Sequence, residues 1–97
     1  MDVSVIICTW NRAKSLAVVL AGLEASVAPE GLDWEVLVVD NNSNDHTRAI
    51  CEAIVKRNPG RFRYIFEGQP GKSNALNAGI LRARGDILAR PPATSAG

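Results

Sequence analysis

Cysteines are few in this sequence, and neither sign of charge is in excess. Two cysteines, Cys8 and Cys51, are too few for a disulfide scaffold and lack the CxxC spacing of a zinc or redox site. We therefore expect both to be small, buried hydrophobic residues. Eleven Lys and Arg residues against ten Asp and Glu residues give a formal net charge of +1. That balance argues against nucleic acid as a partner, because such proteins rely on a strongly basic surface.

Long hydrophobic runs are missing as well. Residues 5–8 and 16–23 are the longest apolar stretches, and both are far shorter than the ~20 residues that span a bilayer. No charged region precedes a cleavable apolar segment, because the first apolar run already begins at Val3. We therefore expect no membrane segment in this chain. We expect a cytoplasmic location, or one on the cytoplasmic face of a membrane in a longer protein.

Short β-branched runs alternate with segments of helical periodicity along most of the chain. The strand-like runs are residues 3–8, 35–40, 62–67 and 86–89. Between them apolar residues recur at helical spacing, as Leu16, Val19, Leu20 and Leu23 do at i, i+3, i+4 and i+7. Helical connections of this length join parallel strands. The pattern predicts an α/β fold with an open parallel sheet in the order β-α-β-α-β-α-β.

The last residues depart from this alternation. Residues 90–97 contain the pair Pro91-Pro92, and proline lacks the N–H donor that a central strand needs. We therefore predict a partial domain over residues 1–89 and an unstructured tail over residues 90–97. The arginines that we expect to be solvated are Arg82, Arg84 and Arg90.

Turn and helix residues give four structural expectations. Asn11 follows the first predicted strand and can cap the helix that comes next. Ser43 and Asp45 follow the second strand, and we expect them to cap a helix rather than to bind a ligand. Gly79 lies inside the third predicted helix, where glycine costs about 1 kcal/mol relative to alanine. That cost predicts close packing of this helix against the sheet.

Polar loops follow the first three predicted strands, at residues 9–12, 40–45 and 68–74. Ligands of open parallel sheets bind at the carboxyl ends of the strands, so these loops predict a ligand site. Asp40 directly ends the second strand. Its carboxylate either accepts hydrogen bonds from a base or ribose, or orders the following turn, and the residues alone leave both interpretations open. We expect this carboxylate to face the ligand crevice rather than the core.

Two common nucleotide-binding motifs are not present. Residues 8–12 contain no GxGxxG, which argues against a dinucleotide cradle. Residues 68–73 resemble a P-loop only superficially, because the first glycine of that motif would fall at Phe66. Lys72 begins a predicted helix, and helix amino termini favour anions, so it is either a phosphate neighbour or a solvated loop lysine. His46 has no partner pattern for a metal or catalytic dyad, and we expect it on the surface.

Three segments follow one another in a recognisable order: Val3–Arg12 (VSVIICTWNR), Glu35–Thr47 (EVLVVDNNSNDHT) and Gly71–Ile80 (GKSNALNAGI). Together they resemble the opening of a family 2 glycosyltransferase with the GT-A fold. The resemblance implies a Rossmann-like amino-terminal half that binds a nucleotide-diphosphate sugar. The complete enzyme would transfer the sugar to a hydroxyl of an acceptor that the sequence does not identify. The residues implied in nucleotide-sugar binding are Thr9 near the base, Asp40 on the base ring, and Asn11, Arg12, Asn42, Lys72, Asn74 and Asn77 along the nucleotide.

The resemblance ends where the family places its metal. There an Asp-x-Asp motif after the fourth strand holds Mg²⁺ or Mn²⁺ on the sugar diphosphate. Residues 90–94 contain no carboxylate, and no acidic residue follows Asp86. The divalent metal implied for the complete enzyme thus lacks its ligands here, and we assign no catalytic residue. We expect the nucleotide-binding half of a transferase, truncated before this motif and inactive alone. The alternative is a non-catalytic nucleotide-binding or interaction module.

Overall fold

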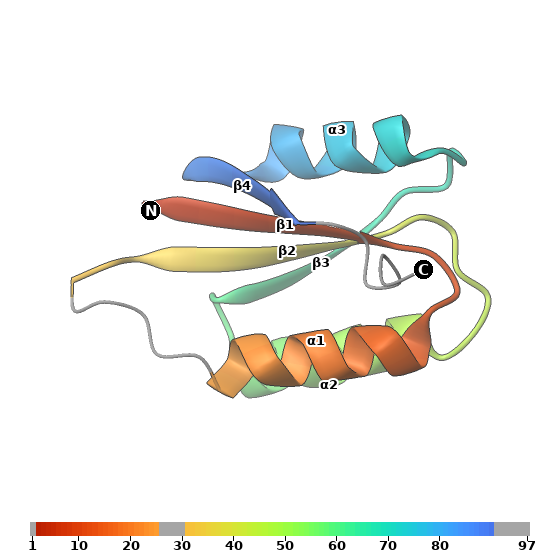
Figure 1. The fold of residues 1–97 in the computed structure, drawn as a ribbon, viewed down its shortest axis with the longest axis horizontal. Coiled ribbons are helices and arrows are strands. Elements are labelled where there is room, and N and C mark those ends of the chain that lie inside the picture. The colour runs from red at the N-terminus through yellow and green to blue at the C-terminus, as the bar shows by residue number, and fades with distance from the viewer. Residues whose placement is uncertain (1, 26–30, 91–97) are drawn as a thin grey trace.

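Strands and helices alternate throughout the part of the chain that the computed structural model describes, residues 2–25 and 31–90 (Figure 1). The elements are β1 (Val3–Thr9), α1 (Ala13–Ala25), β2 (Trp34–Asp40), α2 (Thr47–Arg57), β3 (Phe62–Phe66), α3 (Lys72–Arg82) and β4 (Asp86–Arg90). The strands form one parallel sheet in the order β3-β2-β1-β4. The predicted fold class and order of elements are confirmed.

The helices cover the two faces of the sheet unequally. Figure 1 shows α1 and α2 together on one face and α3 alone on the other. The larger core lies under α1 and α2 and contains Val5, Ile7, Leu16, Leu20, Trp34, Val36, Val38, Cys51, Ile54 and Phe62. The smaller core lies under α3 and contains Ile6, Leu37, Val39, Ile65 and Ala75. Two cores on opposite faces are what a parallel sheet with helical crossovers requires.

The strand β2 is buried along its whole length. It pairs with β1 on one edge and β3 on the other, and helices lie over both of its faces. Successive side chains point to opposite faces, so Val36 and Val38 enter the larger core while Leu37 and Val39 enter the smaller one. The predicted buried strand is confirmed, and it begins at Trp34, one residue earlier than expected.

The helix α3 packs closely on the sheet at Gly79, as predicted. A Cβ atom added at Gly79 would lie 2.7 Å from Cγ2 of Ile6 and 3.2 Å from Cγ2 of Val39. The first distance is shorter than carbon atoms tolerate, so a side chain here would push the helix away from β1 and β2. Glycine at this position is therefore a packing requirement.

Near the amino ends of the strands, the carboxylate of Glu35 is completely buried. It accepts hydrogen bonds from the Ser4 hydroxyl (2.6 Å), the Arg84 backbone N–H (2.9 Å), the Arg84 guanidinium (2.9 Å) and Arg63 (3.1 Å). Burial alone would raise the pKa of Glu35, but these hydrogen bonds outweigh burial and lower the pKa to about 2. A charged Glu35 therefore ties β1, β2, β3 and the α3–β4 connection together.

The ion pair adds a role to one of the arginines. Arg84 is exposed, as predicted, and its guanidinium also supplies the positive charge that the buried carboxylate of Glu35 requires. Arg82 is exposed, as predicted. Arg90 belongs to β4 and pairs in register with Ile7, so the strand extends one residue past the predicted boundary at residue 89. The rest of the predicted tail, residues 91–97, lies outside the described residues.

Two further expectations concern cysteine and membrane segments. Cys51 is fully buried, as predicted, whereas Cys8 is only partly buried. Burial raises the pKa of both thiols, for Cys51 to about 12. None of the helices in residues 2–25 and 31–90 has the length and apolar character to cross a membrane.

Candidate functional site

Three polar loops meet at the carboxyl edge of the sheet. Because all strands are parallel, the loops after β1, β2 and β3 leave the same edge, on the right of Figure 1, and lead into the amino ends of α1, α2 and α3. None of these helices has an acidic residue in its first turn. Three positive helix ends therefore point to this edge without neutralisation from within the helices.

The first two loops brace each other through Asn11. Its backbone N–H donates to the Ser43 hydroxyl (2.8 Å), and its side-chain oxygen accepts from the N–H of Asn44 (2.8 Å). Asn11 adopts a φ of 48°, a left-handed conformation that asparagine tolerates better than most residues. The expectation that Asn11 and Ser43 cap helices is wrong, because both side chains join loop to loop.

Asp45 caps the amino ends of two helices. One carboxylate oxygen accepts from the N–H of Ala13 at the start of α1 (3.2 Å), and the other accepts from the N–H of Thr47 at the start of α2 (3.0 Å). A hydrogen bond from the Thr47 hydroxyl is the main cause that lowers the pKa of Asp45. The predicted capping role of Asp45 is confirmed, and it extends to α1.

The carboxylate of Asp40 lies in the core and not in a crevice. It is only 1% exposed, and it accepts hydrogen bonds from the Ser43 N–H (2.8 Å) and the Tyr64 hydroxyl (2.7 Å). Side-chain alternation is the reason, since Asp40 has the same parity along β2 as Val36 and Val38, which face α1 and α2. The expectation that this carboxylate faces the crevice is wrong, and its contacts are those of the turn-ordering interpretation.

The side chain of Thr9 shares this buried position. Thr9 pairs with Asp40 in register and has the parity of Val5 and Ile7, which lie in the larger core. It is 3% exposed, and its hydroxyl has no hydrogen-bond partner within the described residues. Thr9 therefore presents its backbone rather than its side chain to the loops, and its carbonyl accepts the N–H of Asn41 (2.8 Å).

The remaining predicted residues lie around the loops with their side chains more open to solvent. Asn11 is partly buried, and the exposed ones are Arg12, Asn42, Lys72, Asn74 and Asn77. Asn42 has a φ of 65°. The Asn74 amide donates to the carbonyl of Pro70 (2.9 Å) within the third loop. His46 is exposed at the start of α2, as predicted.

The amino end of α3 differs from the other two helix ends. Lys72 is its first residue, and no described side chain accepts a hydrogen bond from the N–H groups of Lys72, Ser73 or Asn74. At α1 and α2, by contrast, Asp45 takes this role. The first turn of α3 thus combines free donors with an exposed lysine, a combination that binds anions.

Sequence reasoning missed Asn41. Its side-chain amide bonds three backbone groups of residues 67–71, which join β3 to α3. The only signal in the sequence was its place in the polar run after Asp40. That run contains three asparagines, and the sequence does not distinguish between them. Which of them reaches the third loop depends on the sheet register, in which Asp40 pairs with Phe66.

The described residues do not fit a divalent metal. No cluster of three or more His, Cys, Asp or Glu side chains in residues 2–25 and 31–90 is arranged to hold one. At the carboxyl edge, both oxygens of Asp40 and both oxygens of Asp45 already accept hydrogen bonds from the protein. A metal would have to displace these bonds to gain a ligand here.

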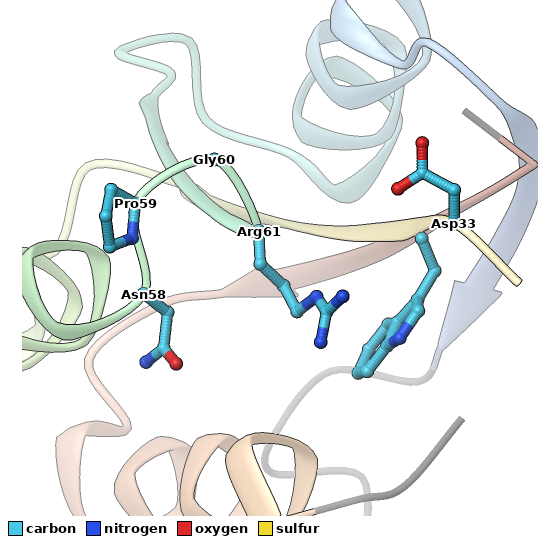
Figure 2. A pocket seen from close by; sticks show the side chains of 6 residues that line it. Asp33, Asn58, Pro59, Gly60 and Arg61 are labelled. Atoms are coloured by element: carbon cyan, nitrogen blue, oxygen red, sulfur yellow. The ribbon is translucent and has the colours of Figure 1, made fainter. Parts of the chain in front are cut away.

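A separate cavity lies at the opposite edge of the sheet. It has a volume of about 370 Å³ and is lined by Asp33, Trp34 and residues 58–61 (Figure 2). The Arg61 guanidinium lies over the Trp34 ring, 4.8 Å from its centroid. None of the predicted site residues lines this cavity, so it is distinct from the three loops.

Comparison with known proteins gives a consistent result. A family model for glycosyl transferase family 2 matches residues 4–90. The chain is 30% identical over 89 residues to an uncharacterized glycosyltransferase of Nostoc sp., covering 92% of this chain and 27% of that protein. The chain thus spans about a quarter of the length of the curated relatives it matches.

Similar solved structures also include a glycosyltransferase. The mannosyltransferase PcManGT from Pyrobaculum calidifontis, in complex with GDP-Man and Mn²⁺, is similar with a TM-score of 0.82 and 27% identity. That match covers 93% of this chain and 27% of the mannosyltransferase. TarS 1–349 of S. aureus, in complex with UDP-GlcNAc, is similar with a TM-score of 0.74 and 31% identity, over 94% of this chain and 26% of TarS.

Proposed function

Because the chain belongs to glycosyl transferase family 2, we propose that it forms the nucleotide-binding part of an enzyme that transfers a sugar from a nucleotide-diphosphate sugar to an acceptor hydroxyl. Its fold is that of the amino-terminal part of GT-A transferases. The bound GDP-Man and UDP-GlcNAc of the two similar structures support this class of donor. The expected cytoplasmic location stays a prediction.

The amino end of α3 is the observation that carries the proposal. A nucleotide-diphosphate sugar carries its negative charge on the diphosphate, which needs N–H donors and a cation. The uncapped N–H groups of residues 72–74 and the exposed ammonium group of Lys72 supply both. Arg12 adds a second exposed cation at the same edge. We assign the diphosphate to this helix end and the nucleoside to the neighbouring loops after β1 and β2.

Two predicted residues take other roles in this assignment. The side chains of Asp40 and Thr9 are buried on the face under α1 and α2, so each supports the loop that follows it. Asp40 orders residues 41–43 through the Ser43 N–H, and Thr9 holds Asn41 through its carbonyl. Preformed loops of this kind lower the entropy cost of binding a nucleotide.

We propose binding without transfer for this chain by itself. The chain spans about a quarter of its relatives' length, and the described residues offer no ligand set for the divalent metal of the complete family enzyme. That same lack of a metal cluster favours the second candidate, a non-catalytic nucleotide-binding or interaction module. The two differ in the free chain. A module unfolds cooperatively as a monomer, whereas a fragment with unpaired strand edges aggregates.

Calorimetry with UDP, GDP and dTDP and their sugars tests the proposal. Lys72→Ala should weaken binding of the nucleoside diphosphate about tenfold, because a charge-assisted contact is lost. Lys56→Ala is the matched control, since Lys56 is an exposed lysine in the last turn of α2, at the other end of a helix. Indifference of the wild-type chain to all three nucleotides, or equal effects of the two substitutions, contradicts the proposal.

A further inference from the structure

One side chain holds the loop between β3 and α3 to the end of β2. The side-chain nitrogen of Asn41 donates to the carbonyl oxygens of Gln69 (2.6 Å) and Glu67 (3.3 Å). Its side-chain oxygen accepts from the N–H of Gly71 (3.1 Å). The Asn41 backbone is itself fixed to β1, because its N–H donates to the carbonyl of Thr9. Asn41 therefore fastens a loop to the most buried part of the sheet.

This arrangement requires a short amide. Asparagine is donor and acceptor at once, and residues 67–71 present both carbonyl oxygens and an N–H to it. An aspartate at the same position would keep the acceptor for Gly71 but turn a second oxygen toward two carbonyl oxygens. An alanine would leave all three backbone groups without their side-chain partner. Other bonds to this loop are few, chiefly Glu67 N–H to the carbonyl of Asp40 (2.8 Å).

The loop ends where α3 begins, at Gly71. Gly71 has a φ of 117°, in a region that residues with side chains disfavour, so this position favours glycine. The next residue is Lys72, the first of α3. The direction of the Lys72 side chain and of the first N–H groups therefore depends on where Asn41 holds Gly71.

Resting on the function proposed above, we propose that Asn41 is a positioning residue. It holds residues 67–71 so that Lys72 and the first N–H groups of α3 meet the diphosphate of the bound nucleotide. Asn41 therefore contributes to the affinity for the diphosphate and not to the affinity for the base. A residue that served the fold in general would affect every ligand and the whole molecule alike.

The substitution Asn41→Asp tests this role, with Asn44→Asp as the matched control. Asn44 lies in the same turn and is exposed, and its side chain does not bond residues 67–71, so both variants add the same charge. Affinity is measured by NMR titration for the nucleoside diphosphate that the wild type binds and for the corresponding nucleoside. We expect Asn41→Asp to bind the diphosphate about tenfold more weakly than Asn44→Asp does. Nucleoside affinity should stay within about twofold of the wild type.

Amide hydrogen exchange of residues 68–75 supplies the second measurement. We expect exchange there to become about tenfold faster in Asn41→Asp and to be unchanged in Asn44→Asp. Unchanged exchange in Asn41→Asp overturns the proposal, and so does an equal loss of affinity for nucleoside and diphosphate. A wild-type chain that binds no nucleotide overturns the proposed function and the diphosphate role with it, while the exchange rates still decide whether Asn41 holds the loop.

Discussion

The two edges of the sheet are held together by different chemistry. At the amino edge, one fully buried carboxylate, Glu35, collects hydrogen bonds from Ser4, Arg63 and Arg84. At the carboxyl edge, four side chains share this role, and each bonds one to three groups, mainly backbone groups of the loops: Asn11, Asp40, Asn41 and Asp45. The amino edge thus concentrates its interactions on one charge, whereas the carboxyl edge distributes them over several polar side chains.

This difference separates stability from binding. A buried charge with several donors is costly to disturb, because the loss of one partner leaves the others unsatisfied. Separate bonds near the surface each contribute little, since water replaces them. The carboxyl edge can therefore leave the donors of α3 free for a ligand, while the amino edge anchors the α3–β4 connection that supports the same helix.

The largest effect is expected at the amino edge from Glu35→Gln. The amide keeps the size of the side chain but loses the charge, and one of its ends can no longer accept from Arg84 and Arg63. We expect the free energy of unfolding to fall by about 3 kcal/mol, measured by urea unfolding at pH 7. Glu52→Gln is the control, because the ion pair of Glu52 with Arg48 is exposed and should contribute under about 1 kcal/mol.

Acid should reduce the difference between Glu35→Gln and the wild type. The pKa of Glu35 is lowered in the folded state to about 2 from an ordinary 4.5, so its charge stabilises the fold above pH 4.5. That contribution is lost as the pH falls from 4.5 toward 2, because the unfolded chain takes up the proton in this range while the folded wild type is protonated only near and below pH 2. A difference in unfolding free energy that stays constant from pH 7 to pH 2.5 would contradict this account of the amino edge.

A smaller effect is expected at the carboxyl edge from Asp40→Ala. The substitution leaves the Ser43 N–H and the Tyr64 hydroxyl without their partner, so we expect a loss of about 2 kcal/mol in unfolding free energy. Tyr64→Phe, which removes only one of the two bonds, should cost less. Unchanged thermal stability together with a loss of nucleotide affinity would contradict this account and indicate that Asp40 binds the base.

The smallest effect is expected from Asn11→Gly, at a partly buried position of the same edge. Glycine loses the acceptor for the Asn44 N–H but adopts a φ of 48° without strain, so the two changes partly cancel. We expect the unfolding free energy to change by less than about 0.5 kcal/mol. Asn11→Ala, which loses the bond and adds strain, should cost more, and chemical unfolding of the pair measures the difference. A large effect of Asn11→Gly would show that the stabilising interactions of the carboxyl edge are not distributed over several side chains.

The spacing of apolar residues was enough to predict the fold, because each strand and each helix has the apolar spacing typical of its type. β2 is apolar on both faces, and a strand of that kind requires helices on both sides. Gly79 was informative for a similar reason, since glycine inside a helix implies that something lies close to it. The contact of Asp45 with the start of α2 is also local, since its carboxylate accepts from the N–H of Thr47 only two residues further along the chain.

Contacts between distant segments could not be predicted in this way. Arg84 is exposed as expected, but nothing near it in the sequence indicates its ion pair, because Glu35 lies 49 positions away along the chain. Asn11 was expected to cap a helix, and nothing in the sequence distinguished Asn41, although each reaches a loop that the sheet brings alongside. The direction of the Asp40 side chain depended on its parity along β2, which a residue at the strand's end does not reveal.

The sequence by itself determined the α/β order, the parallel sheet and the edge at which the polar loops gather, because apolar spacing and loop polarity are local properties of the chain. Only the tertiary structure decided which polar side chains of those loops are open to solvent and which are buried in the fold. The reason is that register and side-chain alternation are set by neighbouring strands. They turned Asp40 and Thr9 into the core and brought Asn41 to the loop that precedes Lys72.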